Sequence, residues 1–160
     1  MLEVEFVSEL MITLLDGLQD KKKSIDTFYT EFEEQFPKQE IVAKRFRGTI
    51  DALLDSVGEV LGTTEFVRPP LFYSLFCAVA HRLYGLPKQQ LPSPHKNLSV
   101  SEKNDLLEAV HTLSGFVSAA RQDEQVPERH RSFVSACLRQ TDNIRPRQVR
   151  LAAIYRAAFG

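Results

Sequence analysis

The amino-acid sequence predicts an all-α protein, a bundle of about seven helices packed around one buried central helix at residues 71–84. The stretch RPPLFYSLFCAVAHRLYG (68–85) is apolar around nearly its whole circumference when it is placed on a helix, which is typical of a buried helix. In the other segments, apolar residues recur at steps of three and four, the period of an amphipathic helix. No segment alternates apolar and polar residues clearly enough to predict a strand.

The first part of the chain predicts three amphipathic helices. An apolar stripe indicates one helix from the start of the chain to about Asp20. Segment 24–36 predicts a second helix, and segment 39–61 predicts a third. Gly62 follows the third helix and is expected to end it as a C′ glycine.

The central helix has recognisable start and stop signals. Pro69 and Pro70 fit its first turn, where a missing N–H group costs little. Gly85 is typical of the residue just after a helix. Three polar side chains interrupt the apolar surface and fall together in one narrow sector: Ser74, His81 and Arg82.

The second half of the chain predicts one long loop and three more helices. Segment 86–98 is rich in proline and polar residues, and we expect a mobile surface loop. Ser99 and Glu102 have the spacing of a capping box and open the next helix. Two shorter helices follow at 127–138 and 146–159.

The length of 160 residues fits a single domain, and the charge is unevenly distributed along it. Residues 1–66 have a net charge of −7, whereas residues 128–160 have a net charge of +5. A basic end on an acidic chain indicates either an anionic partner or an ionic contact within the molecule.

The cysteines and the first residues indicate the compartment. Cys77 and Cys137 lie in apolar helical contexts, without a CxxC motif, and we expect buried free thiols in a reducing environment. Acidic residues interrupt the first apolar run, so that it does not resemble a signal peptide. No apolar run is long enough to cross a bilayer. The expected location is the cytoplasm.

Motifs for catalysis are missing from the sequence. It contains no phosphate-binding loop, no HExxH and no G-x-S-x-G. None of the four histidines has a carboxylate or a cysteine at the spacing of metal ligands. We therefore expect no catalytic residue, no metal site and no cofactor in this chain.

The arginine-rich C-terminal end is the feature with the sharpest functional interpretation. Guanidinium groups around a helix N-terminus can bind phosphate, because the free N–H groups and the helix dipole also favour anions. The candidate phosphate-binding or nucleic-acid-binding residues are Arg139, Arg145, Arg147 and Arg150. The alternative is that Arg147 and Arg150 pair with the acidic helices of residues 1–66. The sequence leaves both open.

Three segments together resemble a known family: FVSELMITLLDGLQDKKKSIDTFY (6–29), FVRPPLFYSLF (66–76) and FVSACLRQTDNIRPRQVR (133–150). They resemble the C-terminal helical half of proteins whose N-terminal half is a ParB/sulfiredoxin-like domain, a family of unknown function associated with GmrSD-type modification-dependent restriction. The most specific positions are Arg139, Thr141, Asp142, Asn143, Arg145, Arg147 and Arg150. Helix capping by residues 141–143 and ion pairing would be enough to explain them.

The resemblance implies that residues 1–160 are the C-terminal part of a longer protein, without its ParB-like half. In that family the N-terminal half carries a D-G-x-Q-R motif linked to nucleotide hydrolysis and sometimes to DNA cleavage. Here Asp16-Gly17-Leu18-Gln19 is followed by Asp20 instead of arginine, within a helical pattern. We therefore interpret this segment as a helix end, and not as a catalytic motif.

Three hypotheses of function follow. In the first, the chain is a non-catalytic accessory or scaffold domain of a restriction- or defence-type, ParB-like, nucleotide-dependent nuclease, with that catalytic domain as its partner. In the second, it is a nucleic-acid-binding module that contacts DNA through its C-terminal arginines. A third and weaker hypothesis is an enzyme in its own right. The sequence leaves a second copy of the chain open as a partner, and predicts no membrane contact.

Overall fold

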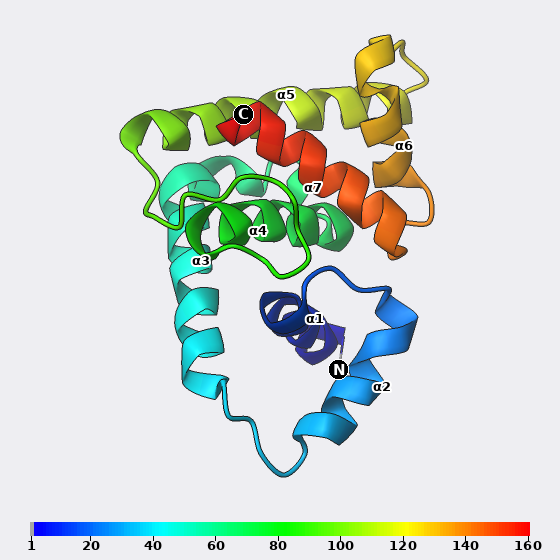
Figure 1. Ribbon diagram of the computed structural model, residues 1–160. Helices are drawn as coiled ribbons and strands as arrows, with labels where there is room; N and C mark the ends of the chain where they lie inside the picture. Colours follow the sequence, from blue (N-terminus) through cyan, green and yellow to red (C-terminus); the bar gives the residue numbers. More distant parts are fainter. Residues whose placement is uncertain (1) are drawn as a thin grey trace.

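Helix α4 (Pro69–Tyr84) lies at the centre of the computed structural model (Figure 1). The structure describes residues 2–160, with the side chains of residues 2 and 21–24 outside the description. Every side chain from Tyr73 to Leu83 is buried, which confirms the predicted core helix. The described residues form helices, turns and loops and contain no strand, so that the all-α prediction is also confirmed.

Six further α-helices and two short 3₁₀ turns complete the chain. Helices α3, α1 and α7 pack directly on α4, while α5 packs across α7 and α3. Figure 1 shows α5 across the top of the molecule, α7 running diagonally beneath it, and α1 and α2 at the opposite end. The elements are α1 (Leu2–Asp16), α2 (Lys21–Phe32), α3 (Gln39–Leu61), η1 (Glu65–Val67), α5 (Val100–Arg121), η2 (Glu128–His130), α6 (Arg131–Leu138) and α7 (Ile144–Phe159).

The first helix ends at Asp16 and not at Asp20, because Gly17 has a left-handed backbone conformation with φ of +84°. The Gly17 N–H donates to the Thr13 carbonyl oxygen at 2.9 Å, which closes the helix end. A Cβ at position 17 would lie 2.4 Å from the carbonyl oxygen of Pro87. The interpretation of this segment as a helix end is therefore confirmed.

Two other predicted helix ends differ from the structure. Helix α2 begins at Lys21, so Ser24 lies inside the helix and is not its N-cap. Gly62 follows α3 as predicted, but its φ of −64° is right-handed. The chain there continues into tight turns toward η1 and does not need the left-handed reversal that glycine allows.

The long loop at 86–98 lies at the surface, as the sequence predicts, and it is bonded to the helices at several points. His81 Nε2 lies 2.8 Å from the Leu91 carbonyl oxygen, and the Leu86 N–H donates to His81 Nδ1 at 2.9 Å. The Tyr155 hydroxyl also donates to the Pro92 carbonyl oxygen. The polar side chains of the core helix and of α7 therefore hold this loop, which sequence composition could not reveal.

Arg82 links the core helix to the start of α5. Its guanidinium donates to Glu102 Oε1 at 2.5 Å and 2.8 Å and to the Lys96 carbonyl oxygen at 2.8 Å. Glu102 also accepts from the Ser99 N–H, and Ser99 Oγ accepts from the Glu102 N–H, which confirms the predicted capping box. Among the described residues, no helix is both long and apolar enough to cross a membrane.

Candidate functional site

Arg147, in the first turns of α7, lies in the interior with 3% of its surface exposed. Its Nη2 donates to Glu9 Oε2 at 2.7 Å, and its Nη1 donates to the Gln19 carbonyl oxygen at 2.9 Å. The guanidinium carbon lies 4.1 Å from the centroid of the Tyr73 ring. This arginine therefore joins α7 to α1 and to the core helix.

The electrostatic surroundings of Arg147 favour its charged form. Burial alone would lower its pKa, but the neighbouring Tyr73 and Glu9 outweigh burial and raise it. The hydroxyl of Tyr73 lies 2.6 Å from Thr13 Oγ1, and burial raises the pKa of this phenol. The cation thus rests on a neutral aromatic face and pairs with a carboxylate, both inside the molecule.

Arg150, one turn further along α7, is completely buried. Its Nε donates to Ser74 Oγ at 2.7 Å, and its two terminal nitrogens donate to the carbonyl oxygens of Ala136 and Thr141 at 2.6 Å and 2.8 Å. Burial lowers its pKa, although an arginine still remains protonated at neutral pH. Arg150 therefore joins the core helix, the end of α6 and the turn before α7.

Of the two alternatives for these arginines, the structure has Arg147 in contact with the acidic N-terminal part of the chain. Arg150 is also engaged within the molecule, but with a hydroxyl and two carbonyl oxygens instead of carboxylates. Arg147 and Arg150 are thus internal contacts of the fold, and the exposed candidates among the four predicted phosphate-binding arginines are Arg139 and Arg145. Both buried guanidinium groups lie out of reach of a macromolecular ligand.

The N-terminus of α7, where the sequence predicts bound phosphate, is already in contact with a carboxylate. Asp20 Oδ1 accepts a hydrogen bond from the Ile144 N–H at 2.6 Å. The chain therefore supplies its own anion to the positive end of this helix dipole.

The segment 141–143 contributes to the contacts of the buried arginines mainly through its backbone and through the charge of Asp142. The Thr141 carbonyl accepts from Arg150, and Asp142 Oδ1 lies 3.7 Å from Arg147 Nη2. Asn143 is the N-cap residue of α7, but its side chain makes no capping hydrogen bond. The predicted capping position is correct for Asn143, while the capping group itself comes from Asp20, more than 120 residues earlier in the sequence.

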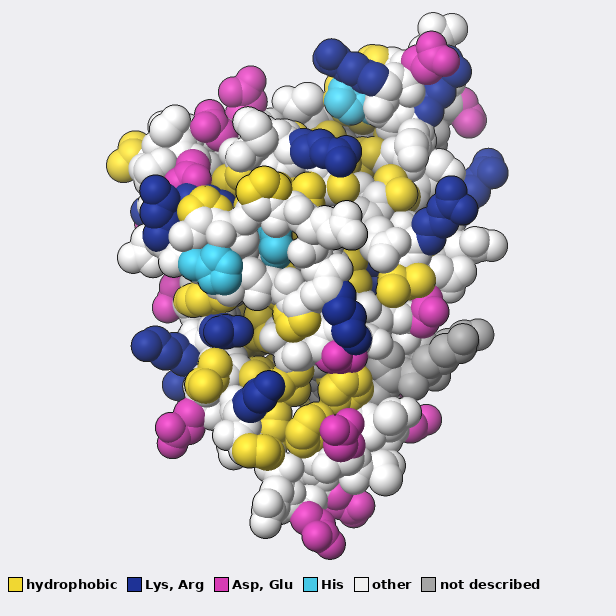
Figure 2. Space-filling view, viewed as in Figure 1, with side chains coloured by type: hydrophobic (Ala, Val, Ile, Leu, Met, Phe, Trp, Pro, Cys, Tyr) yellow, Lys and Arg dark blue, Asp and Glu magenta, His cyan; other side chains and the backbone are white. Residues whose placement is uncertain are grey.

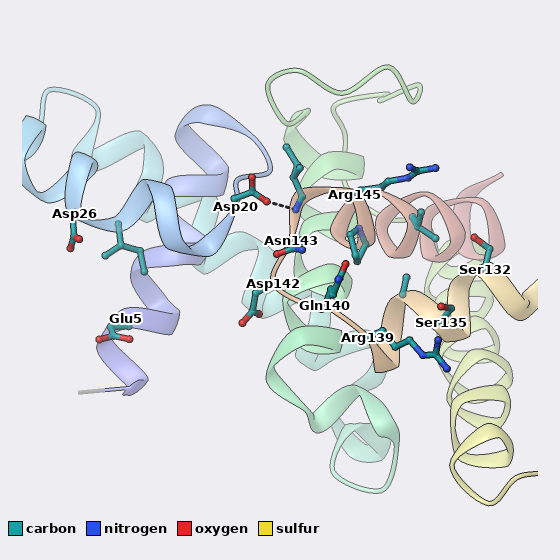
Figure 3. Close-up of a pocket in the computed structure, with 15 residues that line it drawn as sticks. Glu5, Asp20, Asp26, Ser132, Ser135, Arg139, Gln140, Asp142, Asn143 and Arg145 are labelled. Carbon is teal, nitrogen blue, oxygen red and sulfur yellow. Dashed lines mark hydrogen bonds between the residues drawn. The ribbon is translucent and has the colours of Figure 1, made fainter.

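Arg139 and Arg145 are exposed, and they lie on one wall of an open groove of about 1340 Å³, the C-terminal groove. Figure 3 shows both arginines on the side of α6 and α7, with Glu5 and Asp26 on the opposite side. Four carboxylates and these two arginines line the groove: Glu5, Asp20, Asp26, Asp142, Arg139 and Arg145. Among the described side chains the carboxylates outnumber the cations, and this excess of negative charge disfavours a polyanion.

The two cysteines are buried inside the helical core. Within the described part of the chain, no group of three or more His, Cys, Asp or Glu side chains could hold a metal ion. Cys77 and Cys137 are buried free thiols, as predicted, and burial raises the pKa of each to about 12. A thiol with such a pKa is a poor nucleophile at neutral pH.

The partners of the buried arginines could not be found from sequence patterns. Glu9 and Arg147 are 138 residues apart, and Ser74 and Arg150 are 76 residues apart. Glu9 lies on an amphipathic helix among other acidic residues, and Ser74 is one small polar residue in an apolar run. Only the charge difference between the two ends of the chain indicated a contact of this kind.

No protein-family model, no curated protein and no solved structure matches this chain.

Proposed function

We propose that this chain is a non-catalytic helical scaffold domain that supports a catalytic partner of the ParB-like, nucleotide-dependent class implied by the sequence resemblance. The observation that carries the proposal is the internal use of the most specific motif. The hydrogen bonds of Arg147 and Arg150 fix α7 to α1, α4 and α6 and to the connections beside them. These contacts fix the positions of the helices relative to one another. A scaffold domain needs such a fixed surface to bind its partner.

The surroundings of the C-terminal groove support the same proposal over phosphate binding. Asp20 stands at the α7 N-terminus, in the position that a phosphate oxygen would take. A phosphate group would have to displace this carboxylate and enter a groove that has three others. Both steps oppose the binding of a nucleic acid at this place.

The nucleic-acid-binding alternative rests on the exposed arginines alone. Arg139 and Arg145 lie on the groove wall, and the further exposed arginines of this region are Arg129, Arg131 and Arg156. A DNA duplex held by these groups would be bound at least in part through its phosphates. Its affinity would then fall steeply with salt, because each contact releases a counterion.

The two hypotheses can be separated by titrating the chain against a fluorescent DNA duplex at low and at physiological salt. The scaffold proposal predicts no binding at physiological salt, and the same result for an Arg139→Glu/Arg145→Glu variant. Salt-sensitive binding by the parent chain, abolished in this still-folded variant, would instead establish the nucleic-acid-binding module. Circular dichroism melting supplies the check on folding, because both arginines are exposed and their replacement should leave the melting temperature nearly unchanged.

A further inference from the structure

Helix α2 is attached to the molecule along one side only. Among the described residues, α1 is the only helix with which α2 makes an extended packing contact. Figure 1 shows α2 standing apart from the rest of the bundle, at the end opposite α5. A helix held in this way leaves part of its apolar face without a partner inside the chain.

Apolar side chains, partly or fully buried except for the exposed Tyr29, line a groove of about 440 Å³ between α1 and α2, the α1–α2 groove. Its principal apolar residues are Met11 and Leu15 of α1 with Phe28, Tyr29, Phe32 and Phe36 of α2 and the following turn. The rings of Phe28 and Phe32 have centroids 5.8 Å apart, and those of Phe32 and Phe36 have centroids 5.0 Å apart. The three phenylalanines therefore form one continuous aromatic row.

The α1–α2 groove is open to solvent at Tyr29, which lines it and is 52% exposed. Figure 2 shows apolar side chains gathered in the lower half of this face, with acidic side chains along the lower edge and some Lys or Arg side chains beside them. An exposed apolar patch with a charged border is typical of a protein-binding surface.

The charge of the two groove walls indicates what kind of partner fits. Residues 3–16 and 25–36 contain eight acidic side chains and no basic one, whereas the first turn of α2 holds three lysines at 21–23. Glu9 pairs with Arg147, and Asp16 pairs with Lys88. The other six acidic side chains are exposed or half-buried: Glu3, Glu5, Asp26, Glu31, Glu33 and Glu34. Of these, Glu33 lines the α1–α2 groove, with Glu31 and Glu34 close to it in the sequence, and these three are named the acidic border. Glu5 and Asp26 line the C-terminal groove instead.

We infer that the α1–α2 groove is a docking site for an amphipathic helix of a partner protein, with its apolar face on the aromatic row and basic residues toward the acidic border. A groove between two helices matches the shape of a third helix, and the unlike charges would attract it. A second copy of the chain fits less well, because a symmetric contact through this face would bring the two acidic borders together. The inference deepens the scaffold proposal by naming the surface where the partner binds.

The inference can be tested with fluorescently labelled synthetic helices of about 18 residues, long enough to span both groove walls. One peptide has leucines at helical spacing with lysines on its flanks, and a matched peptide has glutamates in place of the lysines. Fluorescence anisotropy should show that the lysine peptide binds about tenfold more tightly or better than the glutamate peptide. The affinity of the lysine peptide should fall by about tenfold in Phe32→Asp and by a smaller factor in Tyr29→Ala.

Charge variants provide a matched control. Glu33→Lys changes the border of the groove, and Glu108→Lys makes the same change on the exposed face of α5, at the other end of the molecule. Only Glu33→Lys should weaken binding of the lysine peptide. Circular dichroism melting establishes that each variant is folded. If Phe32→Asp does not fold, Tyr29→Ala alone tests the contribution of the aromatic residues to peptide binding.

Three results would overturn the inference. The first is equal binding of the lysine peptide to parent, Tyr29→Ala and Glu33→Lys, which would mean non-specific attraction to an acidic protein. The second is no binding of the lysine peptide to the parent chain. The third is dimerisation of the parent through the groove, which analytical ultracentrifugation of parent and Tyr29→Ala would reveal. The duplex titration described above uses another probe and other variants, so failure of docking and failure of the scaffold proposal can be distinguished.

Discussion

At the scale of single residues, the structure depends on buried polar groups that connect helices far apart in the sequence. Arg150, Arg147 and Arg82 are each 3% exposed or less, and each makes at least two hydrogen bonds to other elements. A buried charge without partners would be very costly, so these bonds are conditions for folding as well as contributions to stability.

Replacing Arg150 by methionine should lower the free energy of unfolding by about 3 kcal/mol, because three buried acceptors lose a charged donor. Urea denaturation followed by circular dichroism measures this change. The matched control is Arg139→Met, at an exposed position, which should change stability by less than about 0.5 kcal/mol. Equal effects of the two substitutions would contradict the structural role assigned to Arg150.

Two glycine-to-alanine substitutions should change the free energy of unfolding in opposite directions. Gly17→Ala places a Cβ 2.4 Å from the Pro87 carbonyl oxygen and strains a left-handed backbone, so we expect a loss of stability. Gly115→Ala lies within α5 with no atom within 4 Å of the new Cβ, and it should stabilise the helix by about 0.5–1 kcal/mol. Thermal melting of both variants checks the prediction, and a stabilised Gly17→Ala variant would refute the described helix end.

At the scale of elements, the loop at 86–98 depends on a neutral histidine. Burial lowers the pKa of His81 below its ordinary value of 6.5; the hydrogen bond to the Leu91 carbonyl acts in the opposite direction, and His95 adds to the lowering. The Leu86 N–H donates to His81 Nδ1, and a protonated ring would turn an N–H toward this donor. The attachment of the loop therefore requires the neutral form.

Since the pKa of His81 is lower in the folded than in the unfolded state, its contribution to stability is complete above about pH 6.5 and is lost as the pH falls below that value. We expect the free energy of unfolding to be lower at about pH 5.5 than at about pH 7.5. Urea denaturation at both pH values, on the parent and on His81→Gln, measures the difference. The variant should have the smaller pH dependence, and an unchanged dependence would assign the effect to other groups.

At the scale of the whole molecule, stability should be graded from the core helix toward α2. Helix α4 is surrounded by α1, α3 and α7, whereas α2 has an extended contact with α1 alone within the described part of the chain. Local opening costs little where few apolar contacts are broken. The fold thus combines a firm centre with one loosely attached helix beside the proposed docking groove.

Native-state hydrogen exchange should therefore show the slowest amide exchange in α4 and much faster exchange in α2. Addition of the lysine peptide should slow exchange in α2 and leave α4 unchanged, because the peptide is expected to bind only at the α1–α2 groove. Uniform protection over all helices of the free chain would contradict this gradient.

Much of the architecture was predictable from local patterns, because helical periodicity and start and stop signals act over a few residues. The core helix at 71–84, the capping box of Ser99 and Glu102, and the helix end at Gly17 are of this kind. The sequence also indicated that the basic C-terminal end binds an anionic group. It could not say whether this group belongs to the acidic helices of the same chain or to another molecule, because the net charge of the C-terminal end is the same in both cases.

The tertiary structure decided everything that depends on contacts between distant residues. Arg147 and Arg150 are buried because α7 crosses the core helix at their turns, while Arg139 and Arg145 remain exposed a few residues away. Asp20 reaches the N-terminus of α7 only because the α1–α2 connection passes beside it in space. Local sequence determines which helices form, and the packing of those helices determines which charges meet, because a side chain's burial is a property of all its neighbours.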